Sequence, residues 1–185
     1  REKIDALVCI DDSIVRGTTL KQSILKILGR SKPRKLLIAS TAPQIRYPDC
    51  YGIDMSELGK FIAFQAAVAL INERGFNGLL AEVAKNCREA LKETRPNLVN
   101  HVKKVYENFT PEEISTKVAE LVSPDELNGE PQVEVIYQGI ENLHEALPDH
   151  PGDWYFTGDY PTPGGYRVAH KAFLNFYENK NGRSY

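Results

Sequence analysis

"VCIDDSIVRGTT", residues 8–19, joins the end of an apolar run to two adjacent acids and then to a Gly-Thr-Thr sequence. The apolar run at 6–11 is typical of a buried β-strand. Residues 18–32 repeat apolar side chains at helical spacing, and 34–41 is a second strand-like run. Strand, helix and strand in this order predict a parallel βαβ unit with a right-handed crossover. We expect the strand at 6–11 to lie at the edge of the sheet.

Downstream of residue 55 the periodicity is mainly helical. We expect helices at 56–75, 77–93, 96–109, 110–122, 139–147 and 166–180, and a further strand at 133–138. Thr110 and Glu113 have the spacing of a capping box. The stretch 148–165 is rich in Gly, Pro and aromatic residues, which predicts a loop. The chain is therefore expected to divide into an α/β part, residues 1–75, and a mainly helical part, residues 76–185.

Composition excludes several classes of protein. The net charge of the 185 residues is −2, so no broad surface for nucleic acid or an anionic membrane is expected. No apolar run approaches the roughly 20 residues that a membrane span needs. The three cysteines, which are odd in number and far apart, suit a reducing compartment, so we expect a cytoplasmic protein. The chain starts at Arg1 and has one methionine, Met55, which suggests part of a longer protein.

The residues after the first strand have a pattern that suits a phosphorylated sugar. Parallel sheets bind ligands at the carboxyl ends of their strands, where Asp11 and Asp12 lie. A helix start with Gly17 and hydroxyls at Ser13, Thr18 and Thr19 suits a phosphate. Carboxylates suit sugar hydroxyls or Mg²⁺ instead. The motif is neither a Walker P-loop nor a dinucleotide-binding loop. The alternative is structural, with Asp11 as a cap, Asp12 a solvated acid and Gly17 an ordinary turn.

The same stretch resembles the motif with which type I phosphoribosyltransferases bind phosphoribosyl pyrophosphate (PRPP). The form "DDSIVRGTT" is similar to that of the amidophosphoribosyltransferase family, also called glutamine phosphoribosylpyrophosphate amidotransferases. "STAPQIRYPDCYGIDM", residues 40–55, is similar to a second segment of this family, and 152–168 resembles the tail of a bacterial subgroup. The resemblance implies an α/β fold: part of a type I phosphoribosyltransferase with its Rossmann-like parallel sheet, followed by a mainly helical C-terminal region.

The resemblance also implies roles for the matched residues. Asp11 and Asp12 would meet the ribose hydroxyls and the Mg²⁺ that PRPP carries. The whole site for the ribose and its 5′-phosphate would consist of Asp11, Asp12, Ser13, Val15, Arg16, Gly17, Thr18 and Thr19. Arg16 has an alternative as a solvated surface residue, and Tyr47 and Tyr51 either line a nucleotide site or pack. The resemblance assigns no catalytic residue to this chain.

The family transfers ammonia from glutamine to PRPP and forms 5-phosphoribosylamine, in the first step of de novo purine biosynthesis. This is a glycosyltransferase reaction with Mg²⁺ as cofactor. The family's glutaminase domain and the first half of its transferase domain precede the motif, so we expect this chain to be inactive alone and to belong to a homo-oligomer. Two alternatives remain: a non-catalytic regulatory module that senses PRPP or nucleotide, and a phosphoribosyltransferase that uses a base as nucleophile.

The remaining polar and aromatic candidates have ordinary interpretations. His101, His144, His150 and His170 lack metal-ligand spacing, which favours surface or packing roles. Three cysteines without a Cys-x-x-Cys pair do not indicate an iron–sulfur cluster. The aromatic run 154–156 resembles a stacking surface for nucleic acid, but the chain has no basic groove to accompany it, so packing is expected.

Overall fold

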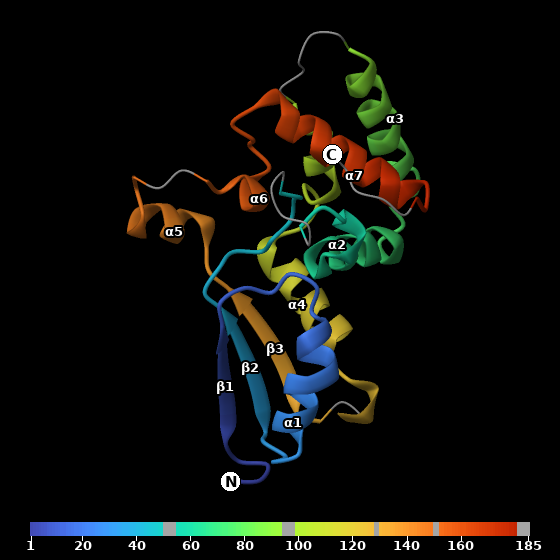
Figure 1. Ribbon diagram of the computed structural model, residues 1–185. Coiled ribbons are helices and arrows are strands. Elements are labelled where there is room, and N and C mark those ends of the chain that lie inside the picture. The colour runs from blue at the N-terminus through green and yellow to red at the C-terminus, as the bar shows by residue number, and fades with distance from the viewer. Residues whose placement is uncertain (50–54, 94–98, 128–129, 150–151, 181–185) are drawn as a thin grey trace.

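Three parallel strands form the sheet of this protein. The computed structural model describes residues 1–49, 55–93, 99–127, 130–149 and 152–180, and the side chain of residue 126 is not described. The strands are β1 (Ala6–Asp11), β2 (Lys35–Ser40) and β3 (Gln132–Tyr137), in the order β1-β2-β3. Asp11, Ser40 and Tyr137 are register partners at the carboxyl ends, and all strands run toward the helical half of the molecule (Figure 1). The predicted α/β class and the parallel strands are confirmed.

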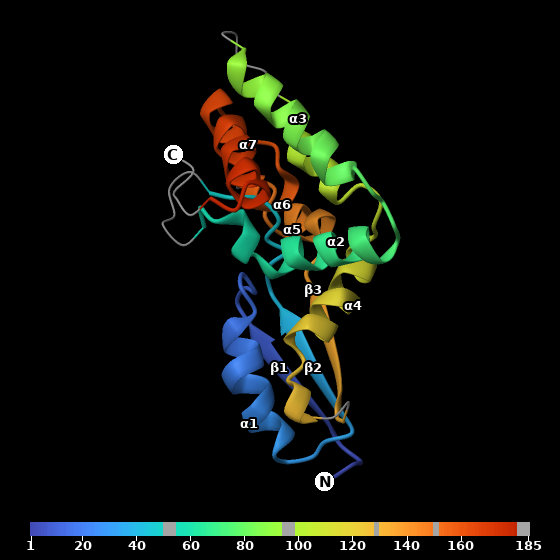
Figure 2. The same cartoon turned by 90° about the vertical axis from the view of Figure 1, so that its right-hand side faces the viewer.

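Both long connections cover the same face of the sheet. The β1–β2 connection contains a π-helical turn (Leu20–Ile24) followed by α1 (Leu25–Gly29). The β2–β3 connection contains α2 (Ile62–Glu73), α3 (Leu79–Lys92) and α4 (Pro111–Val122). Figure 2 shows α1 and α4 in front of the three strands. Side chains of β2 that point toward these helices are fully buried, as at Leu36 and Ile38.

The helix α4 begins where the sequence predicts. The Thr110 hydroxyl accepts a hydrogen bond from the Glu113 amide, and the Glu113 carboxylate accepts one from the Thr110 amide. This reciprocal pairing satisfies two of the amide groups that a helix start leaves without partners. Pro111 at the first helical position adds a backbone angle that already suits a helix.

Two predicted helices are shorter than expected. Within 56–75 a 3₁₀ turn (Leu58–Lys60) comes first, Phe61 is extended, and the α-helix begins at Ile62. The break is tertiary in origin, because the Ile62 amide donates to the Val15 carbonyl. Within 99–109 the structure has a 3₁₀ helix (His101–Val105) where the sequence predicts an amphipathic helix. Asn100 sets this start, since its side chain accepts from the Val102 amide and donates to the Gly158 carbonyl.

The last part of the chain forms hydrogen bonds with the loop that follows β2. It contains α5 (Ile140–Ala146), α6 (Trp154–Thr157) and α7 (Pro163–Tyr177). The short helix α6 lies within the stretch predicted as a loop, and α7 begins earlier than predicted because Pro163 is a good first helical residue. The Tyr155 carbonyl accepts hydrogen bonds from two consecutive amides, those of Arg46 and Tyr47, at 2.9 and 3.0 Å.

The strand β3 links the two predicted parts of the chain, since it lies within 76–185 and pairs with β2. The division near residue 75 stays a prediction. No helix in the described residues is long and apolar enough to cross a membrane.

The opposite face of the sheet is exposed. Val8 and Ile10 of β1 are 60% and 72% exposed, and Ile136 of β3 is 43% exposed. On the same face, Lys35 and Glu134 form an ion pair between β2 and β3. Within the described residues β1 is an edge strand, as predicted. Parallel sheets usually have both faces covered, so this face is a surface that favours association.

We expect the chain to self-associate through this face. Light scattering should show a mass that rises with protein concentration. Replacing Val8 and Ile10 together by Lys should keep the chain monomeric, because a charged face resists desolvation. The matched control is Ile27→Lys on α1, where the native side chain is also 60% exposed. A monomer at every concentration, or equal effects of both variants, would contradict this expectation.

His170 is a buried histidine in α7 that faces a second histidine. Its side chain is 2% exposed, and its Nε2 accepts a hydrogen bond from the His101 amide at 3.3 Å. The two rings stack with centroids 5.2 Å apart. Burial, together with a smaller contribution from the neighbouring His101, lowers the pKa of His170 to about 4. The neutral imidazole is therefore part of the folded state.

The free energy of unfolding should consequently fall as the pH is lowered from about 6.5 to about 4. In this window the unfolded chain binds a proton at His170 and the folded chain does not. The full contribution is about 3 kcal/mol. Urea unfolding across this window should show that His170→Gln, which cannot titrate, loses this slope. The exposed His144→Gln should retain it, and equal slopes in the chain and in His170→Gln would refute the assignment.

Candidate functional site

The acid pair lies at the carboxyl end of β1 and is tied to the next strand through backbone groups. The Thr41 amide donates to the Asp11 carbonyl at 2.9 Å, and the Thr41 hydroxyl donates to the Asp12 carbonyl at 3.2 Å. Each carboxylate also accepts the amide that follows it: Asp12 to Asp11 at 3.1 Å, and Ser13 to Asp12 at 2.9 Å. These bonds hold both carboxylates at the strand end and leave further lone pairs for a ligand.

Burial raises the pKa of the Asp11 carboxyl. A hydrogen bond with the Asp12 side chain and repulsion by its charge also raise the pKa of Asp11, whereas the hydrogen bond from the Asp12 amide lowers it. A cation or a hydroxyl donor beside Asp11 would favour the ionised form. In the described residues no group of three or more His, Cys, Asp or Glu is placed to hold a metal ion. Two carboxylates still fit Mg²⁺, which commonly combines one or two of them with substrate phosphates and water.

The loop after the acids ends at the start of a helix, and its conformation is set by Gly17, a backbone hydrogen bond and two buried side chains. Gly17 has a φ of +68°, which is a conformation that favours glycine. Its carbonyl accepts from the Lys21 amide at 3.0 Å, so Thr18 and Thr19 lie in the first turn, where amides lack an intrahelical acceptor. The flanking Ile14 and Leu20 are 3% and 2% exposed and anchor the loop. The π-helical turn that follows is a form often found at functional sites.

The structure thus places most of the predicted site residues at the two ends of one loop. Asp11, Asp12 and Ser13 lie at the strand end, and the exposed Thr18 and Thr19 lie at the helix start. Val15 serves the fold through its carbonyl, which accepts from the Ile62 amide at 2.8 Å. Arg16 is half-buried, which does not match a fully solvated surface arginine. The roles of these residues toward a ligand stay predictions.

The second motif is mostly packed. Tyr47 is 3% exposed and meets Tyr106 edge to face, with ring centroids 5.4 Å apart. Burial raises the pKa of Tyr47 far above its usual value. Of the two interpretations of Tyr47, the structure supports packing. Tyr51 lies outside the described residues.

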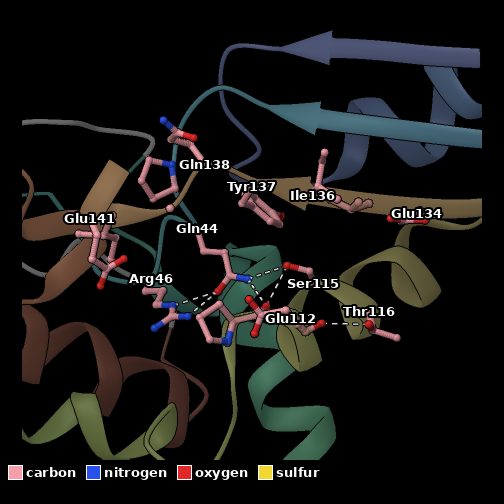
Figure 3. A pocket seen from close by; sticks show the side chains of 15 residues that line it. Gln44, Arg46, Glu112, Ser115, Thr116, Glu134, Ile136, Tyr137, Gln138 and Glu141 are labelled. Atoms are coloured by element: carbon pink, nitrogen blue, oxygen red, sulfur yellow. Dashed lines mark hydrogen bonds between the residues drawn. The ribbon is translucent and has the colours of Figure 1, made fainter. Parts of the chain in front are cut away.

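Sequence reasoning missed a polar group in this motif. Arg46 donates from Nε and Nη2 to the Gln44 side-chain oxygen, at 3.0 and 2.7 Å. Gln44 is 4% exposed and donates to the Pro111 carbonyl and to the Ser115 hydroxyl of α4. These residues line a pocket of about 550 Å³ between α4, the loop after β2, and the end of β3 (Figure 3). The one signal in the sequence is a Gln and an Arg inside an otherwise apolar, Pro-containing segment.

The class of protein is defined by its parallel sheet, by the acid pair at the end of β1, and by the glycine before the following helix. It is an α/β protein whose fold is consistent with part of a phosphoribosyltransferase, followed by helices. The known proteins to which the chain is similar include amidophosphoribosyltransferases. The chain is 36% identical over 93 residues to the amidophosphoribosyltransferase of Escherichia coli (strain K12), a match that covers 50% of this chain and 18% of that protein.

Two further relatives extend this similarity. The amidophosphoribosyltransferase of Haemophilus influenzae is 45% identical over 67 residues, 36% of this chain and 13% of that protein. That of Saccharomyces cerevisiae is 45% identical over 58 residues, 31% of this chain and 11% of that protein. The matches span less than a fifth of the length of these relatives. No family model matches the chain. The resemblance predicted from 8–19 and 40–55 is confirmed, and the chain is consistent with part of such an enzyme.

Gly17→Ala should destabilise the chain more than the same substitution does at a positive-φ glycine that has free space around it. A Cβ at Gly17 would lie 2.8 Å from Cγ1 of Val122 and 3.1 Å from Cγ1 of Ile62. Strain and overpacking together should lower the free energy of unfolding by about 2–4 kcal/mol. Gly75 has a similar φ of +70° with nothing within 4 Å of its Cβ position, so Gly75→Ala isolates the strain.

Chemical denaturation measures both variants, and Val122→Ala provides a double-mutant cycle. Removing the Val122 methyl groups should recover part of the Gly17→Ala loss, because the closest clash disappears. Equal losses for Gly17→Ala and Gly75→Ala would show that the loop is not packed against α4 as described.

Proposed function

We propose that the loop 11–19 binds the ribose 5-phosphate part of PRPP, with Mg²⁺, as part of an amidophosphoribosyltransferase. That activity transfers ammonia from glutamine to PRPP and yields 5-phosphoribosylamine for purine biosynthesis. The observation that carries the proposal is the placement of two carboxylates and a helix start at the two ends of one loop. The amidophosphoribosyltransferase relatives support the same assignment.

The carboxylates of Asp11 and Asp12 have the chemistry that a ribose requires. Ionised carboxylates accept hydrogen bonds from two neighbouring hydroxyls, and charge-assisted bonds of this kind are stronger than neutral ones. The 2′- and 3′-hydroxyls of ribose are such a pair. Mg²⁺, bound between the acids and the ligand, would supply positive charge that neutralises the pyrophosphate leaving group.

The helix start has the chemistry that a 5′-phosphate requires. Amides of the first turn and the positive end of the helix dipole attract anions. Gly17 has no side chain, so a phosphate can approach the backbone closely. The hydroxyls of Ser13, Thr18 and Thr19 make no hydrogen bond within the described residues, so they can donate to phosphate oxygens.

The role of these residues in the reaction would be positional. When pyrophosphate leaves C1 of the ribose, positive charge develops at that carbon, and ammonia attacks it. Holding the ribose by its hydroxyls and its phosphate fixes C1 for attack, which is a large part of catalysis when two reactants must meet. The chain spans less than a fifth of its relatives' length, so we propose that turnover requires further parts like theirs.

Calorimetric titration of the chain with ribose 5-phosphate and Mg²⁺ tests the proposal. We expect saturable binding that weakens about tenfold in Asp11→Asn and in Asp12→Asn, because each loses a charge-assisted bond. Binding should also weaken as the pH falls toward the raised pKa of Asp11, because a proton then competes with the ligand. Glu107→Gln, at an exposed site, is the matched control.

Pyrophosphate release from PRPP, with ammonium supplied directly, separates binding from catalysis. We expect this chain to bind without turnover, because each missing preorganised donor costs roughly 10²–10³ in rate. Turnover that depends on Asp11 and Asp12 would show that the chain is sufficient by itself. Absence of saturable binding, or binding that both Asn variants leave unchanged, would overturn the proposed site.

A further inference from the structure

We propose that the pocket between α4 and β3 binds a free amino acid through its carboxylate and its ammonium group. The pocket has a volume of about 550 Å³, within the range of small-molecule sites. It is separate from the ribose-phosphate loop, because none of residues 11–19 lines it. Its walls come from the loop after β2, the first turns of α4, and the junction of β3 with α5 (Figure 3).

The first element of the site is an arginine that is held in place by neutral groups. Arg46 donates twice to the Gln44 side chain, and its guanidinium lies 5.3 Å from the centre of the Tyr106 ring. The Tyr106 hydroxyl in turn donates to the Arg46 carbonyl at 2.7 Å. Within the described residues no carboxylate pairs with Arg46. A guanidinium fixed in this way keeps its charge for a carboxylate ligand.

The second element is a pair of acids on the other walls. Glu112 lies in the first turn of α4 and Glu141 in the first turn of α5, and both line the same pocket. Neither takes part in an ion pair within the described residues, whereas the neighbouring Glu113 pairs with Arg74. Arg46 therefore faces the same cavity as two acids without an ion pair to either of them.

Separated charges of opposite sign favour a ligand that carries both. A carboxylate beside Arg46 and an ammonium group beside Glu112 or Glu141 would satisfy the two sides of the pocket together. A ligand with one charge would satisfy only one side. The remaining wall is partly apolar, with Val135, Ile136 and Ile140, so an amino acid with an aliphatic side chain fits best.

Leucine is the probe that tests the site, followed by nuclear magnetic resonance of the ¹⁵N-labelled chain. We expect saturable binding in the millimolar range that shifts the Arg46 side-chain Nε–H signal. Two half-ligands are matched controls: N-acetylleucine lacks the ammonium group, and leucinamide lacks the carboxylate. Each should bind about tenfold more weakly, because one charge-assisted contact is lost.

Variants assign the two ends of the ligand. Arg46→Gln should abolish the preference for leucine over leucinamide. Glu112→Gln combined with Glu141→Gln should reduce the preference for leucine over N-acetylleucine. Both acids are exposed, so this double variant should fold even where Arg46→Gln does not. Glu145→Gln, an exposed acid of α5 outside the pocket, should change nothing.

Three results would overturn the proposal. They are equal affinities for leucine and both half-ligands, no saturable shift with leucine, and leucine binding that neither the Arg46 variant nor the glutamate variants alter. Ribose 5-phosphate binding is measured separately, so failure at this pocket would leave the assignment of the 11–19 loop unaffected.

Discussion

The central strand β2 is the element on which the rest of the structure depends. It pairs in parallel register with β1 on one side and β3 on the other, so that Asp11, Ser40 and Tyr137 end at the same level. Parallel pairing places all carboxyl ends at one edge, and backbone that leaves this edge is free to form loops. The acid pair lies at the end of β1, the Gln44–Arg46 group follows β2, and the opposite wall of the pocket comes from the end of β3 and the residues after it.

The helices fix these loops by close packing. The turn at Gly17 lies against Val122 at the end of α4 and Ile62 at the start of α2. A hydrogen bond from Lys21 to the Leu121 carbonyl ties the first helical turn to the same end of α4. The start of α4, in contrast, carries the Ser115 hydroxyl and the Pro111 carbonyl that orient Gln44. One helix therefore supports the two candidate sites at its opposite ends.

Local features of the chain were predictable, and tertiary ones were not. Apolar runs located β1 and β2, and the Thr110–Glu113 pair located the start of α4, because each signal lies within a few residues. The sequence also predicted that Asp11 and Asp12 end the first strand and that Gly17 precedes the start of the next helix. It did not predict the extended Phe61 or the short helix after Asn100, since both depend on hydrogen bonds to distant carbonyls. The role of Arg46 was not predicted for the same reason, because the groups that position it, Tyr106 and the Gln44 side chain bound to α4, depend on residues far along the chain.

The contacts between the tail and the loop after β2 have a consequence for how the protein acquires its structure. The Tyr160 hydroxyl donates to the Pro48 carbonyl across 112 residues, and the Tyr155 carbonyl holds the adjacent amides of Arg46 and Tyr47. Contacts of such long range form late, because chain closure must precede them. During synthesis on the ribosome, β1 and β2 emerge well before the tail that completes the loop between β2 and α2. The nascent chain consequently exposes an incomplete loop at the carboxyl edge of the sheet until α6 and the residues that follow it have been synthesised.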